Sequence, residues 1–459
     1  MAGAKPLPRR ETHRGAVFMN QHNINYAEHS LATVPLPRKL RRDRLTSTIG
    51  ATCLTFCVSF VIAFGLLVPS GTAHFNVNVS AYLIQYTLLA GVSGLCFALV
   101  GKLVPRFGIR RLIIIGGTIT TLSIFAMSLT TNLYLFYVFA AVHGVGWSAC
   151  TLVAATVVVN GWHVHRRKGT VLGLVLAGNA VGGMVWGFVL PPVIRSFGWS
   201  GGMQLLAIIA AVMMVLPGIF LIKNPPRAIN TGNPDAPVKL PTLRKAELVG
   251  VMALLTLGTF CICLEGGAIQ ILPTLLEHRG IDTAKAGALV SMYAIGGIFA
   301  KPLFGYLYDK IGPLRSVWVA SLAYVVAFPG IALTQSVASY YLFIPLMALA
   351  LATFTVLVPL IVADAVGQAR FPDAYGKVMT VGSLGLAIAT PLWGLAFDIT
   401  GSFTPALYAA AVLGVLGLVL LHLGRTRGRA VALRTTRQAQ AAMASESTAP
   451  DATEAAAGR

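Results

Sequence analysis

The sequence predicts an all-α membrane protein with twelve transmembrane helices, arranged as two pseudo-symmetric six-helix bundles. The chain is strongly apolar, with a mean hydropathy of +0.75 and only 11% charged residues, whereas a soluble domain carries about 25%. The charges are also clustered, because residues 112–165, 316–363 and 399–424 contain no Asp, Glu, Lys or Arg. The two longer charge-free runs each have room for two helices, since a spanning helix needs roughly 20 apolar residues.

Each apolar run is expected to be a helix, because unpaired backbone groups are costly in lipid. The predicted spans are residues 46–69, 80–103, 111–130, 133–158, 169–193, 202–222, 247–272, 285–308, 316–333, 339–364, 376–398 and 404–423. The six cysteines all lie within these spans and show no metal or disulfide spacing. We therefore expect no metal site and no cofactor.

The placement of the basic residues indicates the orientation of the chain. All but four of the 35 Lys and Arg residues fall in the terminal tails or in loops on the same side as the tails. Basic loops face the cytoplasm, so both termini are expected there, with the protein in the inner cell membrane. This topology explains the formal net charge of +20, which therefore does not indicate nucleic-acid binding.

The predicted domains follow from the longest break between spans, residues 223–246, which is rich in proline and basic residues. We expect a basic cytoplasmic tail (1–45), an N-terminal bundle (46–222), a cytoplasmic central loop (223–246) and a C-terminal bundle (247–423). The remaining residues, 424–459, are expected to form a disordered cytoplasmic tail, because they are basic and then rich in Ala, Ser, Thr and Glu.

The two halves resemble each other in sequence. "GKLVPRFGIRR" (101–111) aligns with "GYLYDKIGPLR" (305–315), and residues 169–187 align in the same order with residues 376–394. Duplicated halves around a site at the membrane midplane are a recurring architecture of transporters. The matched pairs include Gly101/Gly305, Arg106/Lys310, Gly108/Gly312 and Trp186/Trp393.

The repeated segments resemble the signature of the major facilitator superfamily, G-x-L-x-D-[RK]-x-G-[RK]-[RK], which follows the second and eighth helices. The second copy, "GYLYDKIG", matches well, whereas the first copy has Pro105 in place of the family's aspartate. The resemblance covers about residues 46–423. It implies the major facilitator fold and secondary transport.

Further segments are similar to the monocarboxylate transporter and oxalate–formate antiporter group: "NGWHVHRRKGTVLGLVLAG" (160–178), "VPLIVADAVG" (358–367) and "PLWGLAFDITGSF" (391–403). Lys301 stands where this group commonly has an arginine implicated in binding the substrate carboxylate. The resemblance therefore implies an organic-anion carrier.

The chain departs from that group in two respects. A lysine lacks the bidentate fork with which arginine matches a carboxylate. The animal carriers also place an aspartate where this chain has Gly297, and a lysine in the first helix, which is uncharged here. Substrate and proton coupling are therefore not inherited from the resemblance alone.

Lys301 is expected to hold the substrate anion. It lies eight residues before Asp309, roughly 12 Å into the helix at 1.5 Å per residue, and burying a lysine there costs roughly 2.5–3.5 kcal/mol on insertion scales. The alternative is that its long stem lets the ammonium reach the cytoplasmic interface. Tyr293 lies on the same helix face and is a candidate to donate a hydrogen bond to the substrate, although taken by itself its position favours plain packing.

Glu265 and His143 are the candidates for proton coupling. Glu265 is the only acid well inside a predicted span, where desolvation penalises the charged form; the alternative is a structural role in hydrogen bonding between helices. His143 lies near the middle of its span, where it would contact substrate, relay protons or simply pack. Asn179 is a further candidate for the wall of the substrate cavity.

Asp309 is expected to act at a gate, because in the family this acid lies near the start of a helix in the other half. Here that helix begins near Lys168–Gly169, behind Arg166 and Arg167. The dipole and free amides of a helix N-terminus favour an anion, so this contact is expected to latch the cytoplasmic side. The alternative is that Asp309 is only a solvated charge.

The equivalent latch of the first half is expected to be weaker, because Pro105 replaces the acid. Arg106 would then meet Asp373 near the start of the eleventh span. The residues predicted to contribute to gating are therefore Asp309, Arg166, Arg167, Gly305, Gly312, Gly101, Arg106 and Gly108.

The sequence thus predicts a secondary carrier that moves a small mono- or dicarboxylate across the bilayer by alternating access. Proton symport or exchange for a counter-anion would drive it, and a monomer would be the functional unit. No Walker motif or Ser/His/Asp constellation is present, so an enzyme is not expected. Two alternatives stay open: proton-coupled efflux of amphipathic compounds, and a non-transporting membrane sensor built on a carrier fold.

Overall fold

The computed structural model describes residues 37–163, 167–225, 245–266, 272, 275–276 and 278–448. The regular structure among these residues is entirely helical, as predicted. Residues Arg38–Arg459 form one compact unit.

The first half of the chain is a series of helices, and three of its predicted spans (46–69, 133–158 and 202–222) are each divided into shorter helical segments. The helices are α2 (Arg38–Cys57), α3 (Phe60–Leu66), α4 (Val68–Phe75), α5 (Val79–Phe107), α6 (Ile109–Leu129), α7 (Leu133–Cys150), α8 (Leu152–Trp162), α9 (Lys168–Ala210), the π-helical turn η1 (Ala211–Val215) and α10 (Leu216–Phe220). Thr151 separates α7 from α8 with φ −117° and ψ −128°, so the predicted span 133–158 is broken near its middle.

The second half continues after the central segment, of which residues 226–244 lie outside the described part. Its helices are α12 (Lys245–Glu265), α14 (Thr283–Leu333), α15 (Val337–Val366), α16 (Phe371–Thr400) and α17 (Thr404–Thr448). The predicted span 247–272 is therefore helical as far as Glu265.

Nine segments in the described part are long and apolar enough to cross a membrane. Two of them, Lys168–Phe220 and Ser291–Leu333, each cover most of two consecutive predicted spans. The paired spans meet at Gly198 and Gly312, whose φ angles are 70° and 82°. Glycine adopts such angles without steric cost, so a sharp turn joins helices without an intervening loop. The predicted span 376–398 lies within α16.

The two halves repeat one contact between helices. In the first half, the indole N–H of Trp186 on α9 donates to Ser59 Oγ at 2.7 Å, beside the break between α2 and α3. In the second half, the indole N–H of Trp393 on α16 donates to the carbonyl of Leu264 at 2.9 Å, next to the end of α12. The aligned tryptophans therefore hold equivalent helices at equivalent points, as expected for duplicated halves.

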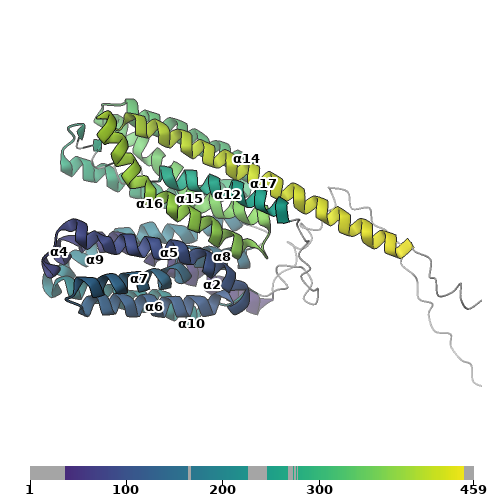
Figure 1. Cartoon of the computed structure of the whole chain (residues 1–459), viewed down its shortest axis with the longest axis horizontal. Coiled ribbons are helices and arrows are strands. Elements are labelled where there is room, and N and C mark those ends of the chain that lie inside the picture. Colours follow the sequence, from purple (N-terminus) through teal and green to yellow (C-terminus); the bar gives the residue numbers. More distant parts are fainter. Residues whose placement is uncertain are drawn as a thin grey trace, which may run out of the picture. The chain divides into compact units, whose positions relative to one another are not determined.

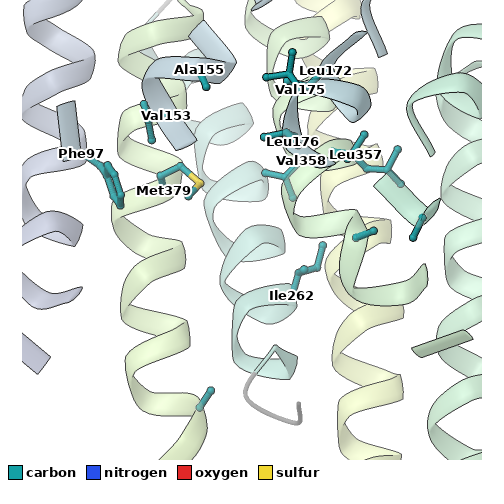
Figure 2. Close-up of a cluster of buried hydrophobic side chains, with 14 of the residues drawn as sticks. Phe97, Val153, Ala155, Leu172, Val175, Leu176, Ile262, Leu357, Val358 and Met379 are labelled. Atoms are coloured by element: carbon teal, nitrogen blue, oxygen red, sulfur yellow. The ribbon is translucent and has the colours of Figure 1, made fainter. Parts of the chain in front are cut away.

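Two helix pairs make the most extensive contacts between the halves, since α9 packs on α14 and α5 packs on α16. Buried apolar side chains from both halves form a common core between them, and Figure 2 shows part of this cluster. Its members include Phe97, Val153, Val175 and Leu176 from the first half and Ile262, Leu357, Val358 and Met379 from the second.

The last helix is longer than a membrane span requires. We expected disorder from residue 424, but α17 continues as a helix to Thr448, and Figure 1 shows it, in yellow, extending beyond α12 and α14. Residues 424–448 are rich in Ala, Arg and Gln, which are strong helix formers. The prediction of disorder from composition was therefore wrong for this stretch.

Arg279 is one of the few basic residues that the predicted topology places on the side of the membrane opposite the termini, and in the structure it binds the end of a helix. Its guanidinium donates to the carbonyls of Ile331, Ala332 and Thr334 at 2.6–3.0 Å and to the hydroxyl of Tyr340 at 2.6 Å. These carbonyls lie at the end of α14, where the helix dipole favours a cation. Arg279 thus caps a helix and binds the loop before α14 to it.

Candidate functional site

Most of the described hydrogen bonds between the two halves lie near one end of the helices, the end predicted to face the cytoplasm, which we call the cytoplasmic end; the bond from Lys301 to Leu176 lies deeper along α9 and α14. They join α9 to α14, α5 to α16, and the segment before α16 to the segment before α9. The structure is therefore closed at its cytoplasmic end.

At this end α9 and α14 touch through two glycines. A Cβ atom on Gly305 would lie 2.0 Å from the carbonyl oxygen of Gly169, and one on Gly169 would lie 2.4 Å from the carbonyl oxygen of Gly305. Real Cβ atoms essentially never approach below 3.0 Å. A larger residue at either position would therefore push the helices apart.

Asp309 lies where the sequence predicted, at the N-terminus of α9. Its carboxylate accepts hydrogen bonds from the backbone N–H of Gly169 at 2.8 Å, and from the backbone N–H and hydroxyl of Thr170, both at 2.7 Å. The first amides of a helix have no partner within the helix, so this carboxylate caps α9 from the other half. The gating role of the contact stays a prediction.

Of the two arginines expected beside this contact, one belongs to the described part of the chain. Arg166 lies outside the described residues, and Arg167 is the N-cap of α9 with a φ of 59°. The signature glycines Gly108 and Gly312 have nearly equal φ angles, 78° and 82°, and each turns the chain from one helix into the next. Lys168, the first residue of α9, interacts electrostatically with Asp309 and with Asp364.

The first-half counterpart packs as closely but contains no acid. A Cβ atom on Gly101 would lie 2.4 Å from the carbonyl oxygen of Pro372, and the backbone N–H of Ala98 donates to Thr380 Oγ1 at 3.1 Å. The matching glycine, Gly376, lies more than one turn inside α16, which begins at Phe371. Its N–H is therefore bonded within the helix, so the first half lacks both the carboxylate and the free amides of the Asp309 contact.

Arg106 does not pair with Asp373 in the described structure, contrary to our expectation. The carboxylate of Asp373 instead accepts a hydrogen bond from Lys377 at 2.6 Å, one turn further along α16. A neighbour at i+4 on the same helix competes well for an exposed carboxylate, whereas Arg106 would have to reach across from α5.

Sequence reasoning missed a second acid at the cytoplasmic end, Asp364 at the end of α15. Its carboxylate accepts from Arg425 Nε at 3.1 Å, from Arg429 at 3.4 Å and from the Tyr308 hydroxyl at 2.6 Å. The signal was available, because Asp364 ends a long charge-free run and matches Asn160 at the same offset as Asp309 matches Pro105. The first half therefore has neutral residues, Asn160 and Pro105, at the positions that align with these two acids of the second half.

Gln368 adds a contact across the two halves. With its amide oriented to satisfy both neighbours, it donates to the carbonyl of Asn160 at 3.2 Å and accepts from Lys168 Nζ at 3.1 Å. The cytoplasmic end is therefore held by a polar network as well as by close packing.

Lys301 lies further from the cytoplasmic end, on the surface of α14 that meets α9. The side chain is half-buried, and its ammonium donates to the carbonyl of Leu176 at 3.3 Å. The helices are in close contact here, since a Cβ atom on Gly173 would lie 2.3 Å from the carbonyl oxygen of Lys301. In the described structure no carboxylate forms an ion pair with Lys301. One turn away, a Cβ atom on Gly297 would meet nothing within 4 Å, so open space adjoins this face.

The other residues predicted to bind substrate are not in contact with Lys301 in the described structure. Tyr293 lies on the same face of α14, two turns away, and interacts electrostatically with Glu265. Asn179 is half-buried on α9, three residues beyond Leu176. These positions are compatible with a shared cavity wall, but the roles stay predictions.

His143 is enclosed within the first half. Its side chain is 1% exposed, with its ring 5.7 Å from the ring of Phe64 and 5.4 Å from that of Trp147. Its Nε2 has no hydrogen-bond partner among the described residues. The described ring contacts of His143 are thus with residues of the first half, and its proposed contact with substrate stays a prediction.

Glu265 is enclosed within the second half and is fully buried. Its Oε2 accepts from the Tyr324 hydroxyl at 3.1 Å, and that hydroxyl lies 3.0 Å from Thr353 Oγ1. These partners belong to the second segment of α14 and to α15. No group of three or more His, Cys, Asp or Glu side chains that could hold a metal ion occurs among the described residues.

Comparisons with known proteins agree with this arrangement. The sequence profile described as Major Facilitator Superfamily matches residues 48–349 and 254–454. The agnestins efflux protein AgnL12 of Paecilomyces divaricatus is 27% identical over 396 residues, covering 83% of this chain and 86% of that protein. Monocarboxylate transporter 11 of Homo sapiens is 24% identical over 388 residues, covering 80% of this chain and 79% of that protein.

The fold is also similar to that of solved transporter structures. The structure of the proton:xylose symporter XylE aligns with a TM-score of 0.66 at 12% identity, covering 83% of this chain and 94% of that one. At this identity the likeness concerns the fold alone. The profile match spans most of the sequence, and we conclude that this chain belongs to the major facilitator superfamily of membrane transporters.

Proposed function

We propose that this transporter moves a small organic anion, a mono- or dicarboxylate, by alternating access, with proton symport or anion exchange as the driving reaction. The predicted bundles, residues 46–222 and 247–423, would be the moving units. Similarity to monocarboxylate transporter 11 supports the substrate class.

The observation that carries the proposal is the environment of the Lys301 ammonium. A cation within a membrane-spanning segment is expensive unless it is paired, yet the described structure offers the half-buried Lys301 a single long hydrogen bond to the Leu176 carbonyl. An ammonium has three N–H donors, so two remain for a ligand. A carboxylate entering the space beside Gly297 would supply both the missing charge and the missing acceptors.

The closed cytoplasmic end supports the alternating-access part of the proposal. Asp309 caps α9 across the two halves, and opening toward the cytoplasm has to break these hydrogen bonds. The glycine contact between Gly169 and Gly305 has to separate at the same time. We therefore assign Asp309 the role of a latch that favours the state closed to the cytoplasm.

Proton coupling has two candidate groups, Glu265 and His143, one enclosed in each half. Tyr293 and Asn179 remain proposed wall residues of the anion site.

A second candidate function is efflux of amphipathic compounds, which the similarity to the efflux protein AgnL12 favours. In that case the substrate would not depend on a positive charge at residue 301.

Uptake into proteoliposomes tests the proposal. Radiolabelled mono- and dicarboxylates should accumulate with the unaltered protein, much less with Lys301→Ala or Lys301→Gln, and measurably with Lys301→Arg, which keeps the charge. Lys285→Gln is the matched control, because Lys285 is an exposed lysine near the start of the same helix. Uptake that is unchanged in Lys301→Gln would overturn the assignment of Lys301 as the anion anchor.

A further inference from the structure

Glu265 is held by side chains from two other helices. It is the last residue of α12, and its Oε2 accepts a hydrogen bond from Tyr324, on the second segment of α14, at 3.1 Å. The same tyrosine hydroxyl is 3.0 Å from Thr353 Oγ1 on α15. Glu265, Tyr324 and Thr353 are all 0% exposed, so this three-residue chain is closed to bulk water.

The position of Tyr324 depends on a glycine of a fourth helix. A Cβ atom on Gly414 of α17 would lie 2.4 Å from the Tyr324 ring. The Tyr324 ring also stacks on Phe328 of its own helix, with centroids 5.7 Å apart and an interplanar angle of 11°. The phenol is thus fixed between α17 and its own helix. Its hydroxyl has little freedom to leave Glu265.

The described groups that face Glu265 are neutral. They are Tyr324 and Tyr293 on the two segments of α14, Thr353 on α15, and Cys263 on α12 itself. From α16 the Trp393 indole donates to the carbonyl of Leu264, and α17 contributes Gly414. Among the described residues, none of the groups that interact with Glu265 carries a positive charge.

This environment disfavours an ionised carboxylate. Moving an unpaired carboxylate into an apolar interior is so costly that such a group takes up a proton instead. The second oxygen, Oε1, is also buried and has no hydrogen-bond partner among the described residues. A carboxyl group with one oxygen accepting from Tyr324 and the other carrying a proton fits these contacts.

We propose that Glu265 carries a bound proton in the state closed to the cytoplasm, and that Tyr324 and Thr353 are positioning residues for this proton site. The proposal rests on the carrier function proposed above and specifies where its proton is bound. The site lies inside the second half, away from the anion held by Lys301. One proton is bound when the carboxylate becomes the carboxylic acid, and one is released in the reverse step.

Helix α16 contacts both the segment that carries Glu265 and the cytoplasmic end of the first half. Glu265 follows Leu264, whose carbonyl is bonded to Trp393 of α16, and the start of α16 packs against Gly101. Release of the proton would leave a charge at the end of α12 that the present contacts do not pair. Such a charge would destabilise the present packing at the end of α12, which contacts α16 through Trp393, and α16 also takes part in closing the cytoplasmic end.

Infrared spectroscopy of the purified protein in lipid tests this inference without a transport assay. A protonated carboxyl group gives a carbonyl stretching band that a carboxylate lacks. In the difference spectrum between the unaltered protein and Glu265→Gln at neutral pH, we expect such a band for the unaltered protein. Tyr324→Phe, which removes only the hydroxyl, should shift this band in frequency and change the pH at which it disappears. Thr353→Val should have a smaller effect of the same kind.

The control variant is Tyr82→Phe, which removes another buried tyrosine hydroxyl, the acceptor of the Trp199 indole N–H at 2.8 Å. The Glu265 band should be unchanged in that variant. Absence of a Glu265-dependent carboxylic acid band at neutral pH would overturn the inference, as would a band unaffected by Tyr324→Phe. If the band is present but carboxylate uptake is absent, the proton site stands and the proposed substrate class fails.

Discussion

Asp309 and Gly169 lie in contact across the two halves of the molecule, with Asp309 Oδ1 accepting the backbone N–H of Gly169 at 2.8 Å. The contact places a negative charge at the first turn of α9, where free amides and the helix dipole both favour it. It is reinforced by Thr170, which donates to the other carboxylate oxygen through its amide and its hydroxyl. Three hydrogen bonds to one ionised group make this the strongest polar contact between the halves in the described structure.

Asp309→Asn should weaken closure of the cytoplasmic end. The amide retains an acceptor but loses the charge, and hydrogen bonds to charged groups contribute about 2 kcal/mol. We expect more modification of a single cysteine at Val358→Cys, in an otherwise cysteine-free protein, by an impermeant maleimide added from the cytoplasmic side. Val358 is 0% exposed and lies in the apolar core between the halves. Asp373→Asn, whose carboxylate pairs locally with Lys377, should leave the modification rate unchanged; equal effects of the two variants would refute the latch.

Gly305→Ala should separate α9 from α14. The added Cβ would lie 2.0 Å from the carbonyl oxygen of Gly169, and a backbone atom cannot move aside as a flexible side chain does. The same Val358→Cys assay should show greater exposure, and transport should fall. Gly250→Ala is the matched control, because a Cβ there would meet nothing within 4 Å. A Gly305→Ala protein with normal transport and normal labelling would show that the two helices need not touch.

Pro105→Asp should not create a second latch, although it restores the acid that the repeat lacks. The amide of Gly376 lies more than one turn inside α16 and is already bonded, so the new carboxylate has no free amides to accept from. Labelling of Val358→Cys should match that of Pro105→Ala, which controls for loss of the proline itself. Slower labelling in Pro105→Asp than in Pro105→Ala would mean that α16 presents free amides after all.

Asp364→Asn should lower stability more than Asp373→Asn does. Arg425 is 7% exposed, and loss of its partner leaves a buried cation without a carboxylate, a change that costs about 2 kcal/mol at a partly buried site. The pair of Asp373 and Lys377 is exposed, with side chains 37% and 45% accessible, and such pairs contribute about 0–1 kcal/mol. Thermal unfolding of the purified variants followed by fluorescence measures the difference. Similar melting temperatures would mean that Arg425 finds another partner.

The sequence allowed the Asp309 contact to be predicted because the signature places an acid and a helix start at fixed positions in the two halves. It did not reveal the partners of Asp364, since Arg425 and Arg429 lie some 60 residues away and only tertiary packing brings them together. The missing Arg106–Asp373 pair has a local cause, because Lys377 lies one turn from Asp373 on the same helix. The weakness of the first-half latch was predicted from Pro105 alone, whereas the structure adds that α16 starts too early to offer free amides.

In the candidate site too, the sequence predicted what depends on local spacing and missed what depends on packing between helices. Spacing along one helix correctly placed Tyr293, Gly297 and Lys301 on one face, because the helical period determines it. It did not indicate that His143 and Glu265 are enclosed within separate halves, since the orientation of a helix about its axis depends on its neighbours. Tyr324 and Thr353 carry no distinctive sequence signal, and only their hydrogen bonds identify them.

The most direct test of the account is ligand-induced thermal stabilisation of the purified protein by mono- and dicarboxylates, because a ligand that binds the folded state stabilises it by mass action. We predict that at least one carboxylate raises the melting temperature of the unaltered protein and of Lys285→Gln, less so that of Lys301→Arg, and not that of Lys301→Gln. A carboxylate that stabilises Lys301→Gln as strongly as the unaltered protein would contradict the central claim that Lys301 holds the transported anion.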